Sequence, residues 1–175
     1  MSEPILQPTQ QVHGTKVFQH SRVYEAPREL VFKAWTDPDC LSKWWGPKGM
    51  QWIGCTMDLR PGGTFLYGLK APNGFEMWGK FVYREVTVPE RLVYVVSFCD
   101  KNGAILRHPL SETWPLEVLS TLAFTEQDGK TITDSTGIPI NATKEECETF
   151  EGGFDSMRKG FTGTLDQLAE FLSRS

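Results

Sequence analysis

The sequence predicts an α+β fold in which a curved antiparallel sheet wraps around one long C-terminal helix. Apolar residues recur at spacings of three or four from residue 141 to about 174, which is the pattern of one helix face. From residue 51 to 138, alternating runs separated by turn signals indicate six strands joined mostly by hairpins. A strand and two short helices come before them. The long helix face needs a broad apolar partner, and the sheet is the partner that the chain offers.

The first strand is expected at residues 16–25, where Ala26-Pro27 ends it. Pro27 suits the first position of a short helix. Asp37 can cap a second short helix, which Gly46-Pro47 stops. The residues of this second helix that are expected to point inward are Cys40, Leu41, Trp44 and Trp45.

The six later strands are expected at residues 51–59, 64–70, 75–88, 91–100, 116–126 and 130–138. Glycine-rich turns separate several of them, such as the turn at Gly62-Gly63. Residues 104–115 are expected to form an irregular or edge segment, because Pro109 and Pro115 do not suit a central strand.

The long helix is expected to begin with a capping box, in which Thr143 accepts a backbone N–H and Glu146 reaches back. Its pattern contains four glycines, each of which costs about 1 kcal/mol relative to alanine. They are Gly152, Gly153, Gly160 and Gly163. Two interpretations stay open. Either the helix is broken near Gly152 into a short and a long piece, or the missing side chains allow close approach to the sheet or leave empty space beside it.

Length and composition indicate one globular domain at residues 15–175, preceded by a flexible leader at residues 1–14. The net charge of −4 argues against a nucleic-acid partner, which requires a basic surface. The sequence shows no signal-peptide pattern and no apolar run long enough to span a membrane. The cysteines form no C-x-x-C pair, which suits reduced thiols and a cytoplasmic location.

Six short motifs occur in an order that is typical of one family. They are AP at 26–27, DP at 37–38, KWWGP at 43–47, MDLRPGG at 57–63, PERL at 89–92 and GFTGTLDQL at 160–168. Over residues 16 to 173 the chain resembles the activator of heat-shock-protein-90 ATPase homologue domain family, within the START-like (SRPBCC) helix-grip superfamily. The resemblance implies a cavity between the sheet and the long helix.

Members of this superfamily bind lipids, hormones, polyketides or other small apolar molecules, and a few are cyclases or aromatase-type enzymes. The co-chaperone that gives the family its name carries a separate N-terminal domain, which we do not expect here. Two features depart from the family pattern. Phe161 stands where the closing motif usually has Trp, and residues 133–136 are unusually polar. Either Asp134 or Thr136 faces the cavity, or the strand twists and both are solvated.

The sequence contains no motif for metal binding or covalent catalysis. His13, His20 and His108 are isolated from cysteines and carboxylates at ligand spacing, so no metal is expected. No G-x-S-x-G motif and no phosphate-binding glycine loop occurs, so no cofactor is expected. Glu76 and Glu85 are candidate general bases only if they are buried.

The candidate ligand-binding residues follow from the alternation of the strands and from the helix face. Aromatic and apolar side chains with a few polar groups are typical of ligand pockets. The candidates are Trp44, Trp45, Phe65, Tyr67, Leu69, Met77, Phe81, Tyr83, Tyr94, Val96, Phe98, Leu122, Phe124, Asp134, Phe154, Met157 and Phe161. Each of them also suits the ordinary hydrophobic core.

The preferred hypothesis is a module that binds a small apolar or amphipathic molecule between the sheet and the helix, without catalysis. One alternative is an enzyme of the cyclase, dehydratase or hydrolase type, which needs a buried titratable group in the cavity. The other is a domain that stimulates a chaperone ATPase, which needs an exposed apolar or charged patch. The expected partner is the small ligand, with no nucleic acid and no membrane; a homodimer and a chaperone are further candidates.

Overall fold

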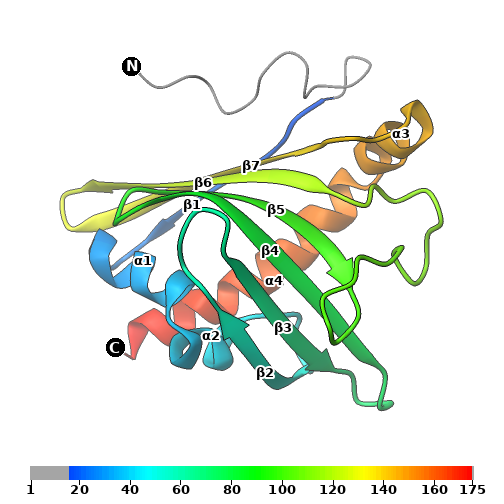
Figure 1. Cartoon of the computed structure of the whole chain (residues 1–175). Helices are drawn as coiled ribbons and strands as arrows, with labels where there is room; N and C mark the ends of the chain where they lie inside the picture. Colours follow the sequence, from blue (N-terminus) through cyan, green and yellow to red (C-terminus); the bar gives the residue numbers. More distant parts are fainter. Residues whose placement is uncertain (1–15, 175) are drawn as a thin grey trace.

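The computed structural model describes residues 16–174, so the leader predicted at residues 1–14 lies outside the described residues. One strand, two short helices, six strands and two further helices follow one another along the chain (Figure 1). The strands are β1 (Phe18–Tyr24), β2 (Gln51–Met57), β3 (Thr64–Lys70), β4 (Glu76–Thr87), β5 (Arg91–Cys99), β6 (Val118–Gln127) and β7 (Lys130–Pro139). The helices are α1 (Arg28–Thr36), α2 (Pro38–Trp44), α3 (Lys144–Gly152) and α4 (Phe154–Ser173). The predicted α+β class is confirmed.

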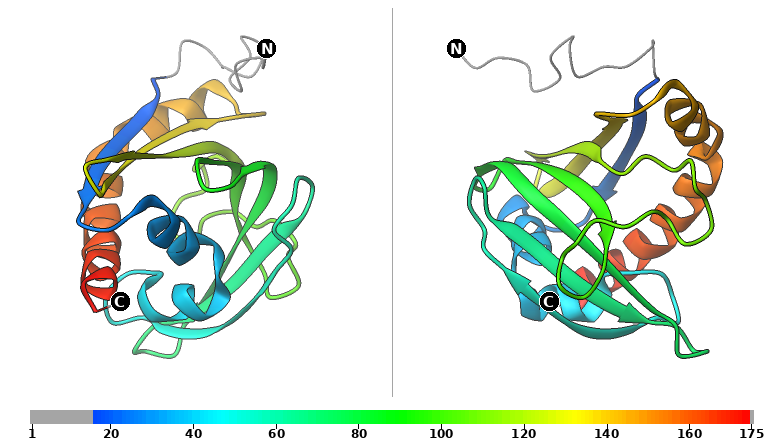
Figure 2. Two further views of the ribbon diagram at one scale, coloured as in Figure 1. Left: turned by 90° about the vertical axis from the view of Figure 1, so that its left-hand side faces the viewer. Right: turned by 45° about the vertical axis from the view of Figure 1, so that its right-hand side comes forward.

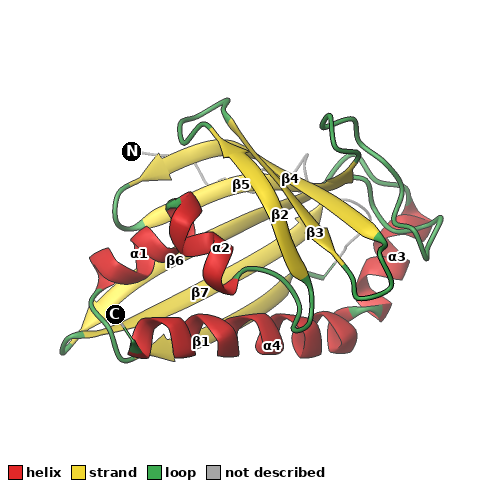
Figure 3. Ribbon diagram, turned by 90° about the horizontal axis from the view of Figure 1, so that it is seen from below, coloured by secondary structure: helices red, strands yellow, loops and turns green. Residues whose placement is uncertain are grey.

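The strands form one antiparallel sheet of seven strands in the order β1-β7-β6-β5-β4-β3-β2. Each strand from β2 to β6 therefore pairs with the next one along the chain, and β1 joins beside β7. Seen end-on, the sheet is an arc with α1 and α2 inside it and α4 across its open side (Figure 2, left). Seen from below, α4 runs along the whole arrangement (Figure 3). This is the helix-grip arrangement that the family resemblance implied.

Alternation along the strands produces two apolar clusters on opposite faces of the sheet. Leu92 and Tyr94 pack with α1, α2 and α4 on the inner face, which is the face toward the helices. Val93 and Val95 pack with Ile138 on the outer face. Successive side chains of a strand point to opposite faces, so both clusters follow from one run of apolar residues in β5.

The C-terminal helical stretch is two helices, so the interpretation of a break near Gly152 is correct and one continuous helix from residue 141 is wrong. α3 ends at Gly152 and α4 begins at Phe154, with Gly153 between them. A Cβ atom on Gly153 would lie only 3.1 Å from the ring of Trp114, so glycine lets this ring pack against the break. The capping box predicted at Thr143 and Glu146 is present.

The two short helices carry a cluster of three tryptophans. Asp37 caps α2 as predicted, because its side chain accepts a backbone N–H of the first turn at 2.9 Å. The rings of Trp35, Trp44 and Trp45 meet edge-on with centroids 4.9 to 5.4 Å apart. Trp44 is buried and donates its indole N–H to the carbonyl of Ala34 at 3.0 Å.

In the described part of the chain, no helix is long and apolar enough to cross a membrane.

Candidate functional site

A pocket of about 330 Å³ lies between α4 and the inner face of the sheet. Its walls come from the first half of α4, the segment after α2, strands β3 to β7, and one residue of β1. The lining residues are mostly apolar or aromatic: Phe18, Trp45, Pro47, Tyr67, Phe81, Tyr94, Val96, Val118, Ser120, Ser135, Thr136, Gly137, Met157, Gly160, Phe161 and Thr164. Ligand pockets typically measure about 300 to 1,000 Å³, so this one has the size for a small molecule.

Small side chains on β6 and β7 leave the hollow open. Ser120 and Gly137 are direct register partners, and Ser135 stands opposite Leu122. Leu122 belongs to the inner cluster, so Ser135 faces inward as well. On α4, a Cβ atom added to Gly160 would meet no atom within 4 Å. At Gly160, therefore, the missing side chain leaves empty space, which is one of the interpretations that the sequence left open.

Four aromatic side chains form one wall of the pocket. Trp45 meets Tyr67 and Phe81 edge-on, with ring centroids 5.6 and 5.8 Å apart. Phe81 stacks on Tyr94 with centroids 4.2 Å apart and an interplanar angle of 11°. Rings that contact several others in this way are held in place, so the wall is formed without any bound molecule.

The polar groups of the pocket are uncharged. Of the described residues that line it, none is Asp, Glu, Lys, Arg or His. Burial raises the pKa of Tyr67 to about 12 and also raises the pKa of Tyr94, so both hydroxyls keep their protons at neutral pH. The indole N–H of Trp45 is buried and has no hydrogen-bond partner in residues 16–174. The pocket therefore offers hydrogen-bond donors but no counterion.

Gln167 holds the segment after α2 against α4. Its side-chain Nε2 donates to the carbonyls of Trp44 and Gly46, at 3.1 and 2.7 Å. These bonds fix the position of Trp45 in the pocket wall. Sequence reasoning did not identify Gln167 as a site residue, because a helical Gln gives no sign of which distant carbonyls it meets. The only available signal was its place in the motif at 160–168.

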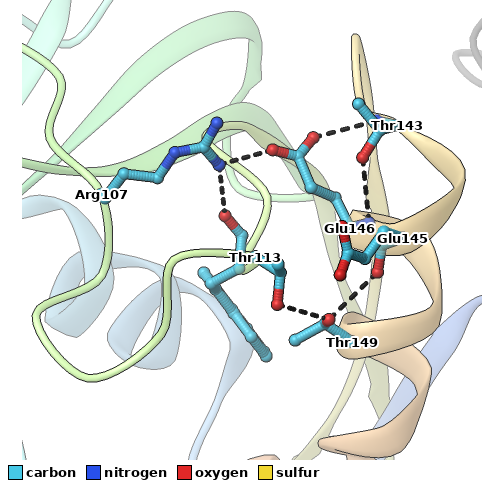
Figure 4. Close-up of polar contacts among 7 residues, drawn as sticks. Arg107, Thr113, Thr143, Glu145, Glu146 and Thr149 are labelled. Atoms are coloured by element: carbon cyan, nitrogen blue, oxygen red, sulfur yellow. Dashed lines mark hydrogen bonds and ion pairs between the residues drawn. The ribbon is translucent and has the colours of Figure 1, made fainter.

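The irregular segment between β5 and β6 is fastened to α3 (Figure 4). The guanidinium of Arg107 donates to the carboxylate of Glu146 and to the carbonyl of Trp114. The hydroxyls of Thr113 and Thr149 share a hydrogen bond of 2.8 Å. We call these contacts the loop clamp. It holds Trp114 beside the sheet, next to a smaller hollow of about 60 Å³.

The structure brings seven of the predicted ligand-binding residues to the pocket. They are Trp45, Tyr67, Phe81, Tyr94, Val96, Met157 and Phe161. Met77 and Phe98 line the smaller hollow beside Trp114 instead. Phe154 packs edge-on against Phe18 and Phe150.

Six other predicted residues are buried in the core and do not line the pocket. They are Trp44, Phe65, Leu69, Tyr83, Leu122 and Phe124. Alternation placed them on the correct face, but α1, α2 and the second half of α4 cover that part of the face. Alternation tells which face a side chain occupies and not what covers it.

The placement of Asp134 in the pocket is corrected by the structure. Asp134 is exposed on β7 and accepts a hydrogen bond from the hydroxyl of Ser21, its register partner on β1. It lies between Thr133, which is buried, and Ser135, which lines the pocket, so alternation turns it outward. Thr136, the other polar candidate, is among the lining residues.

Several lining residues were not predicted, although the same alternation marks some of them. Val118 and Ser120 precede Leu122 at spacings of two, so they share its face. Pro47 and Thr164 carry no such signal, because their positions depend on how the helices pack. The unpredicted residues are Phe18, Pro47, Val118, Ser120, Ser135, Thr136, Gly137, Gly160 and Thr164.

The carboxylates and histidine described near the pocket lie outside its lining. Glu76 is exposed, and Glu85 is bound by Arg91 at 3.4 Å. His20 is the register partner of Ser135 and packs edge-on against Phe161 at 5.2 Å, but it does not line the pocket. Burial, with help from Arg22 and Arg158, lowers the pKa of His20. Within residues 16–174, no cluster of His, Cys, Asp and Glu could hold a metal ion.

Comparison with known proteins gives one family. The family described as "Activator of Hsp90 ATPase homolog 1-like protein" matches residues 25–173. The chain belongs to this family. The suspected resemblance is thus confirmed, and the family match spans every element from α1 to α4. No protein with a curated description matches the chain.

Several solved structures share the fold of this chain. A protein from Mycobacterium smegmatis is 24% identical, with a TM-score of 0.72 over 90% of this chain and 91% of that chain. A protein from Nitrosomonas europaea is 25% identical, with a TM-score of 0.69 over 90% of this chain and 94% of that chain. The AHSA1 protein from Silicibacter pomeroyi is 16% identical, with a TM-score of 0.68 over 90% and 98%. Similarity at this level of sequence identity supports the helix-grip fold and does not indicate a substrate.

Proposed function

We propose that the protein binds a small apolar or amphipathic molecule in the pocket between the sheet and α4. The observation that carries this proposal is the pocket of about 330 Å³, whose lining is mostly apolar and aromatic. Burial of apolar ligand surface there would supply roughly 25 cal/mol per Å² before the costs of association. The carboxylates proposed as general bases lie outside the lining, and the tyrosines within it keep their protons at neutral pH, so binding is the function that the geometry supports best.

A leucine at Gly160 provides the test of this proposal. Gly160 is exposed and lines the pocket, so it lies at the mouth, and a side chain there meets no atom within 4 Å. Gly160→Leu should weaken the binding of naphthalene, an uncharged apolar probe, by about tenfold or more in isothermal titration calorimetry. The fold should be kept, since replacing a helical glycine by leucine stabilises by up to about 1 kcal/mol.

Gly163→Leu is the matched control. Gly163 lies one turn further along α4, a Cβ atom there also meets nothing within 4 Å, and the residue does not line the pocket. Its variant should bind naphthalene as the wild type does. Equal binding by all three proteins would show that the probe does not occupy the pocket, and no binding to the wild type would refute the proposal.

A second candidate function is binding to a chaperone, which the family description suggests. The specific observation is an apolar surface away from the pocket. Phe75 and Leu106 are 51% and 48% exposed, and they line one surface hollow together with Met77 and Pro109. Exposed apolar patches often mark protein contacts. If this surface binds an Hsp90-type chaperone, adding the wild-type protein should raise the ATPase rate of the chaperone. The Phe75→Asp variant should leave that rate unchanged. An ATPase rate that the wild type does not change would exclude this function.

A further inference from the structure

Trp45, which lines the pocket, carries a buried indole N–H without a hydrogen-bond partner among the described residues, and this inference rests on the proposed binding function. In the described chain, five residues carry a buried side-chain polar atom without a hydrogen bond: Tyr24, Arg28, Trp35, Trp45 and Arg91. Of these, Trp45 is the one that lines the pocket. A buried donor left without an acceptor lowers stability, because it has lost its hydrogen bonds to water. A ligand atom that accepts this hydrogen bond would recover that free energy.

A second donor stands beside it. The ring of Tyr67 meets that of Trp45 edge-on at 5.6 Å. Burial raises the pKa of the Tyr67 hydroxyl, and the nearby indole N–H opposes that shift, although the two groups do not complete a hydrogen bond. Two neighbouring residues of the pocket lining thus each carry an uncharged donor, and we call this pair the donor corner.

We propose that the donor corner selects an uncharged ring compound whose carbonyl oxygen accepts hydrogen bonds from Trp45 and Tyr67. A carbonyl oxygen has two lone pairs, so it can satisfy both donors at once. The rings of Phe81 and Tyr94, stacked at 4.2 Å, give the rest of the ligand a flat aromatic wall.

The lack of charge in the lining decides against an anionic ligand. A carboxylate in the donor corner would be buried without a cation, which is costly. A cation beside the pocket, Arg158, lies over the ring of Phe18 at 5.3 Å and pairs with Asp155 at 3.7 Å. It is at the edge of the pocket, on the side of Phe18, and does not line the pocket.

The test compares three probes that share one ring system: naphthalene, methyl naphthyl ketone and naphthoate. Isothermal titration calorimetry at neutral pH should show the ketone binding about tenfold more tightly than naphthalene. Naphthoate should bind at least about tenfold more weakly than the ketone. Trp45→Phe and Tyr67→Phe should each reduce the ketone-to-naphthalene ratio about fivefold, because each removes one donor and keeps an aromatic ring.

The ratio of ketone affinity to naphthalene affinity separates the hydrogen bond from packing. In each variant naphthalene loses the same ring contacts as the ketone, so a change in the ratio reports the lost hydrogen bond. Trp35→Phe is the matched control: Trp35 also has a buried, unpartnered indole N–H, but it does not line the pocket. This variant should keep the wild-type ratio. An unchanged ratio in Trp45→Phe would overturn the inference, as would naphthoate binding as tightly as the ketone in a way that Arg158→Gln abolishes.

The proposed function and the inference fail differently. If naphthalene binds and Gly160→Leu blocks it, the binding function stands whatever the ratio shows. If the ratio is then the same in Trp45→Phe and the wild type, only the donor corner is refuted. If naphthalene and the ketone both fail to bind the wild type, both proposals are refuted.

Discussion

Ser120, Ser135 and Gly137 stand on the inner face of β6 and β7. Further along the same face, β4 and β5 present Phe81 and Tyr94. Protein interiors are otherwise packed about as densely as organic crystals. A leucine buried at one of these positions would contribute about 1.5 to 3 kcal/mol by apolar burial. Compared with leucine, the small residues therefore make the fold less stable, and they leave the space that forms the pocket.

The Ser135→Leu variant tests this argument at the floor of the pocket. The side-chain hydroxyl of Ser135 makes no hydrogen bond with other described residues, and Ser135 stands opposite Leu122 of the inner cluster. A leucine there should fill the hollow, raise the free energy of unfolding by about 1 kcal/mol, and weaken naphthalene binding. Urea denaturation and calorimetry measure the two effects. Ser135→Ala, which removes the hydroxyl without filling space, should leave both nearly unchanged; a strongly destabilised Ser135→Leu would mean that the hollow is not free.

Among the elements, α4 packs into the core with one half and lines the pocket with the other. Leu165, Leu168 and Leu172 of its second half are buried in the core. Met157 and Phe161 of its first half line the pocket. A single apolar stripe predicts the whole helix, but periodicity gives only the direction of a side chain and not its distance from the sheet. The sequence therefore identified the stripe and left open which part of it packs.

Long-range polar contacts set the limit of what the sequence could predict. Strand alternation was sufficient to predict the sheet and to place Tyr67 and Phe81 on the inner face. It did not place Asp134, because polar residues on both faces of β7 leave the direction of alternation ambiguous. The pattern of the sequence did not identify the acceptors of Gln167 either, since they lie more than 100 residues earlier in the chain.

Gln167→Ala is predicted to loosen the segment after α2 from α4. The variant removes two hydrogen bonds to backbone carbonyls that are partly buried, so the free energy of unfolding should fall by about 1 to 2 kcal/mol. Urea denaturation measures this loss. The control is Glu170→Ala on the same helix, which removes only an exposed pair with Arg174 and should change stability by about 0.5 kcal/mol or less. Equal effects of the two changes would show that Gln167 does not hold the segment.

At the scale of the whole molecule, contacts between distant segments fix the distance between the helices and the open arc of the sheet. Arg22 of β1 pairs with Asp166 of α4 at 2.8 Å. The loop clamp joins the segment between β5 and β6 to α3 through Arg107 and Glu146 (Figure 4). Because these contacts join segments far apart in the sequence, they act on global stability, and the clamp makes that stability depend on pH.

The sign of this dependence follows from the pKa of Glu146. Burial alone would raise the pKa, but hydrogen bonds from the Thr143 backbone and from Arg107 outweigh it, so the pKa lies below its ordinary value near 4.5. The folded state therefore favours the charged carboxylate. Its stabilisation is fully present above the pKa of the unfolded chain, and it is lost as the pH falls below about 4.5 and through the lower pKa of the folded state.

Glu146→Gln isolates this contribution, because glutamine can still serve in a capping box but carries no charge. At pH 7 the wild type should be more stable than the variant by about 1 kcal/mol, since Arg107 is partly exposed and its attraction is screened. The difference should shrink as the pH falls from about 5 toward 3, while the histidine contributions are common to both proteins and cancel. Urea denaturation across this range at constant ionic strength measures it. A difference that stays constant from neutral to acidic pH would show that the charge of Glu146 does not stabilise the clamp.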